Sequence, residues 1–246
     1  MIAGSATRST MGDTLADQAI SYECHGLDDP DPLQAESYTL PQQNCPQGFY
    51  QVVFFPSCWN GRDITSANFQ DHVIYPVGTF GRFQGGTCPP THPVRLMTIK
   101  LEQNIHSELF EYYDGAFILA TGDNEGYSSH ADFTNGWDNS ENSLLQRAIN
   151  TCTDNQDRMS ECSVLSSTVN SDYHLCRPES NIPVEDVGIY GGLTKLPGDN
   201  PIWGGSVPKV LTGVSNSPPF GSPYTTLPSN WVYYGCINGG APTLQF

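Results

Sequence analysis

Basic side chains are scarce in this sequence. Ten lysines and arginines stand against 26 aspartates and glutamates, which gives a formal net charge of −16 over 246 residues. Nucleic-acid binding requires a basic face that neutralises phosphates, and these ten cations are too scattered to form one. An anionic membrane surface repels such a chain for the same reason. The composition therefore predicts neither nucleic acid nor membrane as a partner, and leaves neutral ligands such as sugars, and cations.

Long apolar runs and familiar catalytic motifs are also missing. The longest uncharged apolar run covers residues 115–120, far short of the ~20 residues that a membrane-spanning helix needs. Gly-x-Ser-x-Gly, a glycine-rich loop between a strand and a helix, and His-x-x-x-His are all absent. The sequence thus offers no motif for nucleotide chemistry or for a serine nucleophile, and no cofactor is predicted.

Cysteines are present, but no Cys-x-x-Cys pair occurs, so zinc-ribbon and thioredoxin-like sites lose their usual spacing. The eight cysteines occupy positions 24, 45, 58, 88, 152, 162, 176 and 236. An even number in a chain with 24 glycines and 19 prolines favours disulfides in an oxidising, extracellular compartment. Sequence proximity favours pairing Cys152 with Cys162 and pairing the first four cysteines among themselves. Residues 1–20 contain no signal peptide, so we expect a fragment of a secreted protein.

Short strands separated by turns dominate the pattern. Residues 50–55 are β-branched and aromatic and end at Pro56, and further strands are expected over 72–75, 94–101 and 116–121. One helix is expected over 143–151, with Asn142 or Ser143 as its N-cap. The pattern predicts a mainly β fold, an antiparallel β-sandwich-like domain with one short helix and long loops. Residues 166–230 are rich in glycine and proline and lack periodicity, which predicts a linker.

Several longer motifs carry a family resemblance. They are Phe55-Pro56-Ser57-Cys58-Trp59-Asn60-Gly61, Asp71-His72-Val73-Ile74-Tyr75-Pro76, Thr91-His92-Pro93-Val94-Arg95-Leu96, His130-Ala131-Asp132-Phe133-Thr134-Asn135-Gly136-Trp137 and Leu145-Gln146-Arg147-Ala148-Ile149-Asn150-Thr151-Cys152. In this order they resemble the secreted fungal family of domains of unknown function DUF1996. The resemblance covers residues 1–165 and implies a partial domain whose opening portion, with its secretory signal and a histidine-containing segment, is missing.

The resemblance has two further consequences. Residues 231–246, which begin Trp231-Val232-Tyr233-Tyr234-Gly235-Cys236, are similar to the start of a WSC module, a cysteine-rich sugar-binding domain, here truncated. Phe69 stands where the family is expected to have another histidine, and Ala131 where it tends to have glycine. Any active site of the family is therefore expected to be divergent in this copy.

The sharpest candidate for chemistry is the pair His130 and Asp132. On a strand, residues two apart project to the same face, and a carboxylate there orients an imidazole for general-base work. His72 and Asp123 are candidates for a second group, and Asp123 with Asp132 also fits an acid/base pair on a glycosidic bond. The alternative is structural: Asp132, like Asn135 and Asp138, stabilises turns around Gly136.

Two binding hypotheses complete the set. A divalent cation held by His72, His130 and Asp132 is one, although no local spacing supports it. Aromatic rings in polar loops that stack on a pyranose are the other, and Trp59, Tyr127 and Trp137 are the candidates. Trp59 has a competing role beside Cys58 in the core. The remaining histidines, His92 before Pro93 among them, are predicted to be structural.

Together these observations predict a secreted, cell-wall-associated fungal protein that acts on or binds polysaccharide. As an enzyme it would cleave glycosidic bonds with His130, Asp132, Asp123 and His72. The alternatives are a non-catalytic carbohydrate-binding or structural wall protein, with Trp137, Tyr127 and Trp59 on the glycan, and a divalent-metal-binding protein.

Overall fold

The structure, a computed structural model, describes residues 1–27, 36–80, 83–136, 138, 140, 142–152, 159–166, 193–205 and 207–208. The chain forms two compact units. The described parts of 1–134 and 187–215 make up the first, and those of 135–186 belong to the second. The expected mainly β, antiparallel architecture is confirmed, and among the described residues only one of the two α-helices is longer than a single turn.

The strands are short and are joined by long loops. In chain order they are β1 Ile2–Gly4, β2 Ile20–Cys24, β3 Glu36–Ser37, β4 Phe49–Phe54, β5 Cys58–Trp59, β6 Val73–Ile74, β7 Val77–Phe80, β8 Gln84–Thr87, β9 Val94–Arg95, β10 Lys100–Ile105 and β11 His130–Asp132. The helices are α1 Leu15–Gln18, α2 Leu144–Thr151, and the 3-10 turns Met159–Glu161 and Pro197–Asp199.

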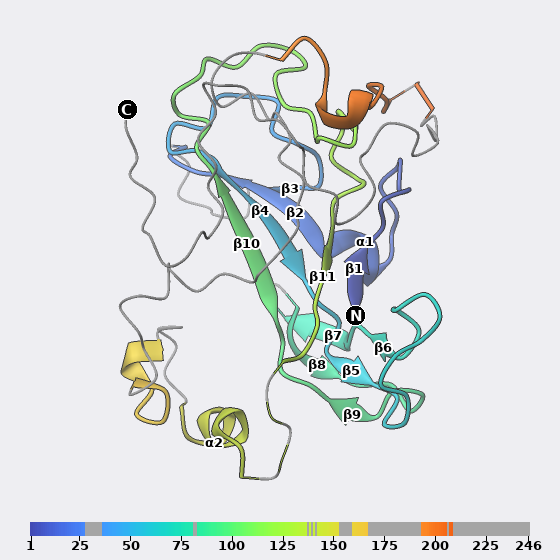
Figure 1. Ribbon diagram of the computed structural model, residues 1–246, viewed down its shortest axis with the longest axis vertical. Helices are drawn as coiled ribbons and strands as arrows, with labels where there is room; N and C mark the ends of the chain where they lie inside the picture. Colours follow the sequence, from blue (N-terminus) through green and yellow to red (C-terminus); the bar gives the residue numbers. More distant parts are fainter. Residues whose placement is uncertain are drawn as a thin grey trace, which may run out of the picture. The chain divides into compact units, whose positions relative to one another are not determined.

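The largest sheet is four-stranded, in the order β10-β4-β2-β3, and these strands lie side by side in Figure 1. All its pairs are antiparallel, and β4 lies inside the sheet, with Val53 opposite Ile20 on one side and Leu101 on the other. β4 is the strand expected over 50–55, which is therefore confirmed. Its β-branched and aromatic residues suit a strand that is paired along both edges.

Both faces of β4 are covered over residues 52–54, which explains the apolar run at the end of the strand. Val53 packs with Ile20 and Ala131 on one face, whereas Val52 and Phe54 contribute to a cluster on the other. Alternate residues of a strand point to opposite faces, so an alternating pattern appears only where one face is solvated. Over residues 52–54 neither face is solvated, and this part of the strand is continuously hydrophobic.

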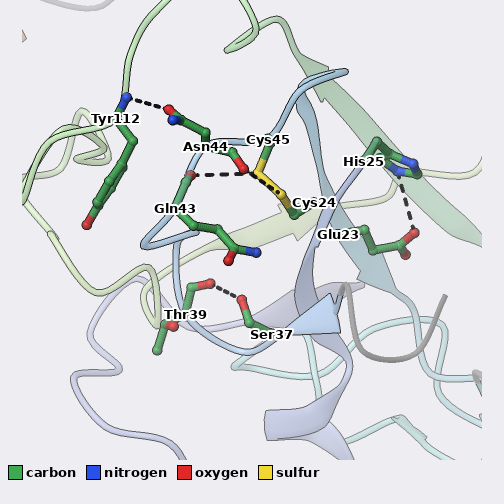
Figure 2. Close-up of a disulfide and its surroundings, with 9 residues drawn as sticks. All are labelled: Glu23, Cys24, His25, Ser37, Thr39, Gln43, Asn44, Cys45 and Tyr112. Carbon is green, nitrogen blue, oxygen red and sulfur yellow. Dashed lines mark hydrogen bonds and ion pairs between the residues drawn. A yellow bond between two sulfur atoms is a disulfide. The ribbon is translucent and has the colours of Figure 1, made fainter. Parts of the chain in front are cut away.

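Disulfides reinforce the domain. Cys24 is bonded to Cys45 at the end of β2 (Figure 2), and Cys58 to Cys88. Cys152 is bonded to Cys162 in the second unit. The pairings expected from sequence proximity are thus confirmed. The remaining two cysteines, Cys176 and Cys236, lie outside the described residues.

Two expected strands differ from the structure. The strand expected over 94–101 is divided into β9 and β10, and β10 continues to Ile105. Residues 116–121 form no strand, because the Gly122 and Leu119 amides bond within the turn, to the carbonyls of Leu119 and Asp123. Phe117 and Leu119 instead pack singly against the cluster around Tyr22. Their apolar character reflects burial without strand pairing.

Part of the expected linker is folded onto the first unit. Trp203 is only 1% exposed, and its backbone exchanges hydrogen bonds with Gly122 and Asn124. Residues 193–205 therefore belong to the β domain. They follow at least 56 residues after Trp137, the last residue of the motif that ends Asn135-Gly136-Trp137. Most of the expected linker over 166–230, and all of the WSC-like stretch over 231–246, lie outside the described residues.

The helix expected over 143–151 is confirmed as α2 in the second unit. Ser143 is its N-cap, since its hydroxyl accepts the Gln146 amide at 3.2 Å. Of the helices in the described ranges, none combines the length and the apolar character needed to cross a bilayer.

Candidate functional site

His130 and Asp132 lie together on β11, as their spacing predicts. Both side chains are exposed, while Ala131 between them is buried in the core. β11 pairs with β1, so that His130 is opposite Gly4 and Asp132 is opposite Ile2. The Nδ1 atom of His130 lies 3.1 Å from the carbonyl oxygen of Ser128. The strand therefore presents an imidazole and a carboxylate on one solvent-facing side.

Asp123 does not join that pair, because it is fully buried. One of its carboxylate oxygens accepts the amides of Glu125 and Gly126 at 2.8 and 3.0 Å, and the other accepts the Ser128 amide at 2.7 Å. Aspartate commonly organises turns by bonding backbone amides a few residues ahead. Asp123 thus holds the 123–128 loop in shape, and its carboxylate does not reach solvent as an acid/base group would need to.

His72 is also buried, with 6% of the residue exposed. Its Nδ1 atom lies 3.0 Å from the Ser66 hydroxyl oxygen. Burial lowers the pKa of the His72 imidazole below its ordinary value, and the nearby Met1 amino group lowers it further. Among the described residues no three His, Cys, Asp or Glu side chains gather as metal ligands. The placement therefore contradicts the expected cation site of His72, His130 and Asp132.

The candidate sugar-stacking aromatics are engaged within the domain. The Trp59 indole N–H donates to the Asp63 carbonyl at 2.6 Å, and the ring follows the disulfide-bonded Cys58 in β5. Tyr127 is half-buried, with the Arg8 guanidinium carbon 6.0 Å from its ring centroid. Trp137 lies outside the described residues. Both described residues, Trp59 and Tyr127, are half-buried.

A pocket of about 510 Å³ lies where β1 and α1 meet the 70–75 segment. We call it the β1–α1 pocket. It is lined by Ile2, Ala3, Gly4, Ser5, Arg8, Ala16, Asp17, Pro56, Gln70, Asp71, Val73, Ile74, Tyr75 and His92. Its size lies within the ~300–1,000 Å³ typical of small-ligand sites.

Arg8 and Asp17 form the most strongly organised polar wall of this pocket. The Arg8 Nε donates to the Tyr127 carbonyl at 2.7 Å, and its Nη1 donates to the Asp17 carbonyl at 2.8 Å and to the Asp17 carboxylate at 3.3 Å. Burial pushes the pKa of Asp17 upward, but hydrogen bonds from Thr14 and Arg8 outweigh it and leave that pKa below its ordinary value. Asp17 is consequently held as a carboxylate.

The second polar wall is made by Gln70, Asp71 and His92. The Gln70 side-chain amide donates to the Gly4 carbonyl at 2.8 Å, which ties this segment to β1. The His92 Nε2 atom lies 3.0 Å from the Asp71 carbonyl oxygen. His92, expected to be structural, therefore both holds the 71–92 loops together and faces the pocket.

β1 connects the pocket to the exposed pair on β11. Directly paired residues of neighbouring strands project to the same face, so Ile2 shares the face of Asp132. Ile2 and Gly4 also line the pocket. The pocket and the His130–Asp132 pair are thus adjacent features of one surface of the first unit, contributed by segments from both ends of the domain.

The sequence model of the domain of unknown function DUF1996 matches residues 1–137. The chain belongs to this family. Every described residue of the β1–α1 pocket and of β11 falls within the match, so this surface is part of the DUF1996 domain itself. The folded segment 193–205 lies beyond the matched range. Comparison with curated proteins and with solved structures gave no match.

The sequence does not mark the pocket residues as one site, because they are ordinary side chains from four separated segments. Arg8 and Asp17 come from a stretch that reads as polar loop, and Gln70 and Asp71 from a turn. Several lining residues do stand in the motifs that carry the DUF1996 resemblance, but nothing in those motifs showed that they meet: Pro56, Asp71, Val73, Ile74, Tyr75 and His92.

Proposed function

We propose that this DUF1996 domain is an extracellular protein of the fungal cell wall that binds polysaccharide in the β1–α1 pocket. A sugar ring carries hydroxyl groups at its edge and apolar C–H groups on its faces, so a binding site needs hydrogen-bonding groups beside apolar surface. The pocket offers Asp71, Gln70 and His92 next to Ile2 and Val73. This combination in one concave site is the observation that carries the proposal.

Two properties of the chain support an extracellular, neutral-ligand role. Disulfides close both the β2 end and the β5 strand, and such bonds persist in oxidising compartments. The net charge of −16 disfavours anionic ligands such as phosphates. A neutral extracellular glycan is compatible with both properties.

Asp17 does not suit the role of the acid in glycosidic cleavage, because that role needs a carboxylic acid that keeps its proton. The lowered pKa of Asp17 has the opposite effect and keeps that group ionised. A bound sugar can still accept or donate hydrogen bonds to a carboxylate, since its hydroxyls do both.

The pocket is tested by filling it. Ala16 lines the pocket from α1 and is exposed, so Ala16→Trp occupies the space without removing a hydrogen bond, and Ala16→Ser is the matched control. Pull-down on insoluble fungal-wall glucans and chitin should show binding by the wild type and Ala16→Ser, and loss of at least about 90% of it for Ala16→Trp. Undiminished binding by a folded Ala16→Trp protein, checked by circular dichroism, contradicts the proposal, as does no binding by the wild type.

A second candidate function, glycosidic-bond cleavage, is favoured by one observation, the exposed His130–Asp132 pair beside the pocket. Soluble sugars released in the same pull-down tubes would report it. Asp132→Asn should then abolish release while binding persists, whereas Asp13→Asn, an exposed control that belongs neither to β11 nor to the pocket lining, should change neither. Absence of release from the wild-type protein would leave binding as the function.

A further inference from the structure

The loop that follows β10 exposes an unusual concentration of apolar side chains. Leu109, Phe110 and Tyr113 are 79%, 72% and 70% exposed, although they lie within five positions of one another. Isolated exposed apolar residues are normal on protein surfaces, but contiguous ones mark interaction sites. We call residues 106–115 the aromatic–acidic loop.

This loop is anchored at its base. The Phe110 amide donates to the carbonyl of the buried Ser107 at 3.1 Å, which closes a turn. The Tyr112 amide donates to the Asn44 side-chain oxygen at 2.6 Å, and Asn44 precedes the disulfide-bonded Cys45, as Figure 2 shows. The exposed rings are therefore presented by a braced support, which reduces the entropy lost when a ligand binds.

The loop is also rooted in the core on its C-terminal side. Phe117 meets Phe49 edge-to-face with ring centroids 5.0 Å apart, and Tyr112 lies 6.0 Å from Phe117. Phe110 and Tyr113 have no such ring contact among the described residues, so their faces are open to solvent. Phe110 and Tyr113 are exposed because the loop is anchored to the core through neighbouring residues, Tyr112 and Phe117.

Negative charge surrounds the exposed rings. Glu108, Glu111 and Asp114 are exposed members of the same loop, and no lysine or arginine occurs in the sequence between Lys100 and Arg147. A hydrogen bond from His106, 2.8 Å away, holds the pKa of Glu108 below its ordinary value, so this carboxylate stays ionised. The surface combines apolar rings with a carboxylate field of one sign.

We propose that the aromatic–acidic loop is a docking surface for a cationic glycan, a glucosamine polymer with free amino groups. The faces of Phe110 and Tyr113 would stack on the apolar faces of the sugar rings, and the ammonium groups would be attracted both to those rings and to Glu111 and Asp114. This goes beyond the pocket proposal, because no residue of this loop lines the β1–α1 pocket.

Other occupants fit less well. A stable protein–protein interface takes ~20–30 residues on each side. This loop supplies ten positions, six of them exposed acidic or apolar residues, which is too small a surface. An anionic lipid leaflet would repel the carboxylates. A neutral glucan would use the rings and leave the carboxylates without a role, whereas a cationic glycan uses both.

The experiment uses the full chain and a fully deacetylated glucosamine oligosaccharide at a slightly acidic pH that keeps its amines protonated. Its N-acetylated counterpart, which has the same backbone without the charge, is the comparison ligand. Calorimetric titration should show that Phe110→Ala/Tyr113→Ala weakens binding of the deacetylated ligand about tenfold or more, at unchanged net charge. Ile64→Ala, at a position that is 91% exposed elsewhere, is the apolar control and should bind as the wild type does.

Charge is tested by a second matched pair. Glu111→Gln and Asp13→Asn change the net charge equally, at exposed positions inside and outside the loop. We expect Glu111→Gln to weaken binding about threefold and to reduce its salt dependence, and Asp13→Asn to leave both unchanged. Equal effects of the two variants would mean non-specific attraction to an acidic protein and would overturn the proposal.

Three other results would also overturn it: equal affinity for both oligosaccharides, full affinity of the Phe110→Ala/Tyr113→Ala protein, or binding only to a basic peptide. The Ala16→Trp variant separates this proposal from the pocket proposal. Ala16→Trp should still bind the deacetylated oligosaccharide even if it no longer binds neutral glycans. A failure of the pocket proposal can therefore be distinguished from a failure of the loop proposal.

Discussion

The indole N–H of Trp203 donates a hydrogen bond to the backbone carbonyl of Thr121, 2.9 Å away and 82 residues earlier in the chain. Around this bond the Trp203 backbone pairs with Gly122 and Asn124. Gly122 has a φ of +92°, and a Cβ there would collide with the Pro201 carbonyl oxygen. The segment around Trp203 thus closes over the 121–124 turn, directly above the loop that Asp123 organises, and ties a remote part of the chain into the DUF1996 domain.

Removing this side chain should destabilise the domain. Trp203→Ala is expected to lower the free energy of unfolding by about 3–5 kcal/mol, because it empties a fully buried site and leaves the Thr121 carbonyl without its donor. Urea denaturation followed by circular dichroism measures this. Ile202→Ala, next to it and 53% exposed, is the control and should stay within about 0.5 kcal/mol of the wild type. Equal effects would show that the segment is not docked.

Asp123 should behave as a structural residue. Asp123→Asn is expected to lower the free energy of unfolding by about 2–3 kcal/mol, since an amide nitrogen facing the Glu125 or Ser128 amide cannot accept its hydrogen bond. Asp132→Asn, an identical change at an exposed position, should leave stability within about 0.5 kcal/mol. Chemical denaturation of both variants gives the comparison. A stable, folded Asp123→Asn protein would disprove the structural role.

The disulfides should act separately on the two units. Replacing Cys24 and Cys45 by alanine is expected to destabilise the first unit by about 3 kcal/mol, because a bond that spans 21 residues restricts the unfolded chain. Replacing Cys152 and Cys162 should leave the melting of the first unit unchanged, as that bond lies in the second. Differential scanning calorimetry resolves the two cases. A shift of the first-unit transition in the second variant would show that the units unfold together.

His72 should make stability depend on pH. Its pKa in the folded protein lies below the ordinary 6.5, through burial and the Met1 amino group, against the opposing carboxylates of Asp63 and Asp71. In the unfolded chain the imidazole recovers its ordinary pKa and takes up a proton that the folded state resists. The stabilising effect is therefore complete above pH 6.5 and declines as the pH falls from 6.5 toward the folded pKa.

Melting temperatures measured between about pH 5 and 8 test this. The wild type should lose stability on the acidic side of that range, and His72→Gln should lose less. His106→Gln, at an imidazole that is 69% exposed, should follow the wild type. If His72→Gln keeps the full acid dependence, another group is responsible.

Local sequence patterns predicted those elements that depend on residues close to one another in the chain. The apolar run in β4, the helix α2 and the Cys152–Cys162 pair could be read from the sequence, since each depends on residues within a short window. The pairing within the first four cysteines, and the choice of Ser143 over Asn142 as N-cap, came from the structure. The order of the family motifs likewise identified DUF1996, which the match over 1–137 confirmed.

The structure of residues 116–121 and 193–205 could not be predicted from local patterns. Phe117 and Trp203 are apolar side chains that are partly and fully buried, respectively, although their segments are irregular. Apolar character alone does not distinguish a strand from a loop that packs onto a core. Asp123 carries the same ambiguity. A carboxylate next to glycines reads equally as an acid/base group or as a turn organiser, and only its three backbone amide donors decide between them.

By itself, the sequence determined the mainly β class, the Cys152–Cys162 disulfide, the family and the acidic charge that disfavours anionic ligands, because these follow from composition and from motifs close in the chain. Only the tertiary structure decided that Asp123 and His72 are buried away from the exposed His130 and Asp132, and that four distant segments enclose the β1–α1 pocket. The physical reason is that solvent exposure and mutual approach depend on contacts between residues far apart in sequence, to which no local pattern is sensitive.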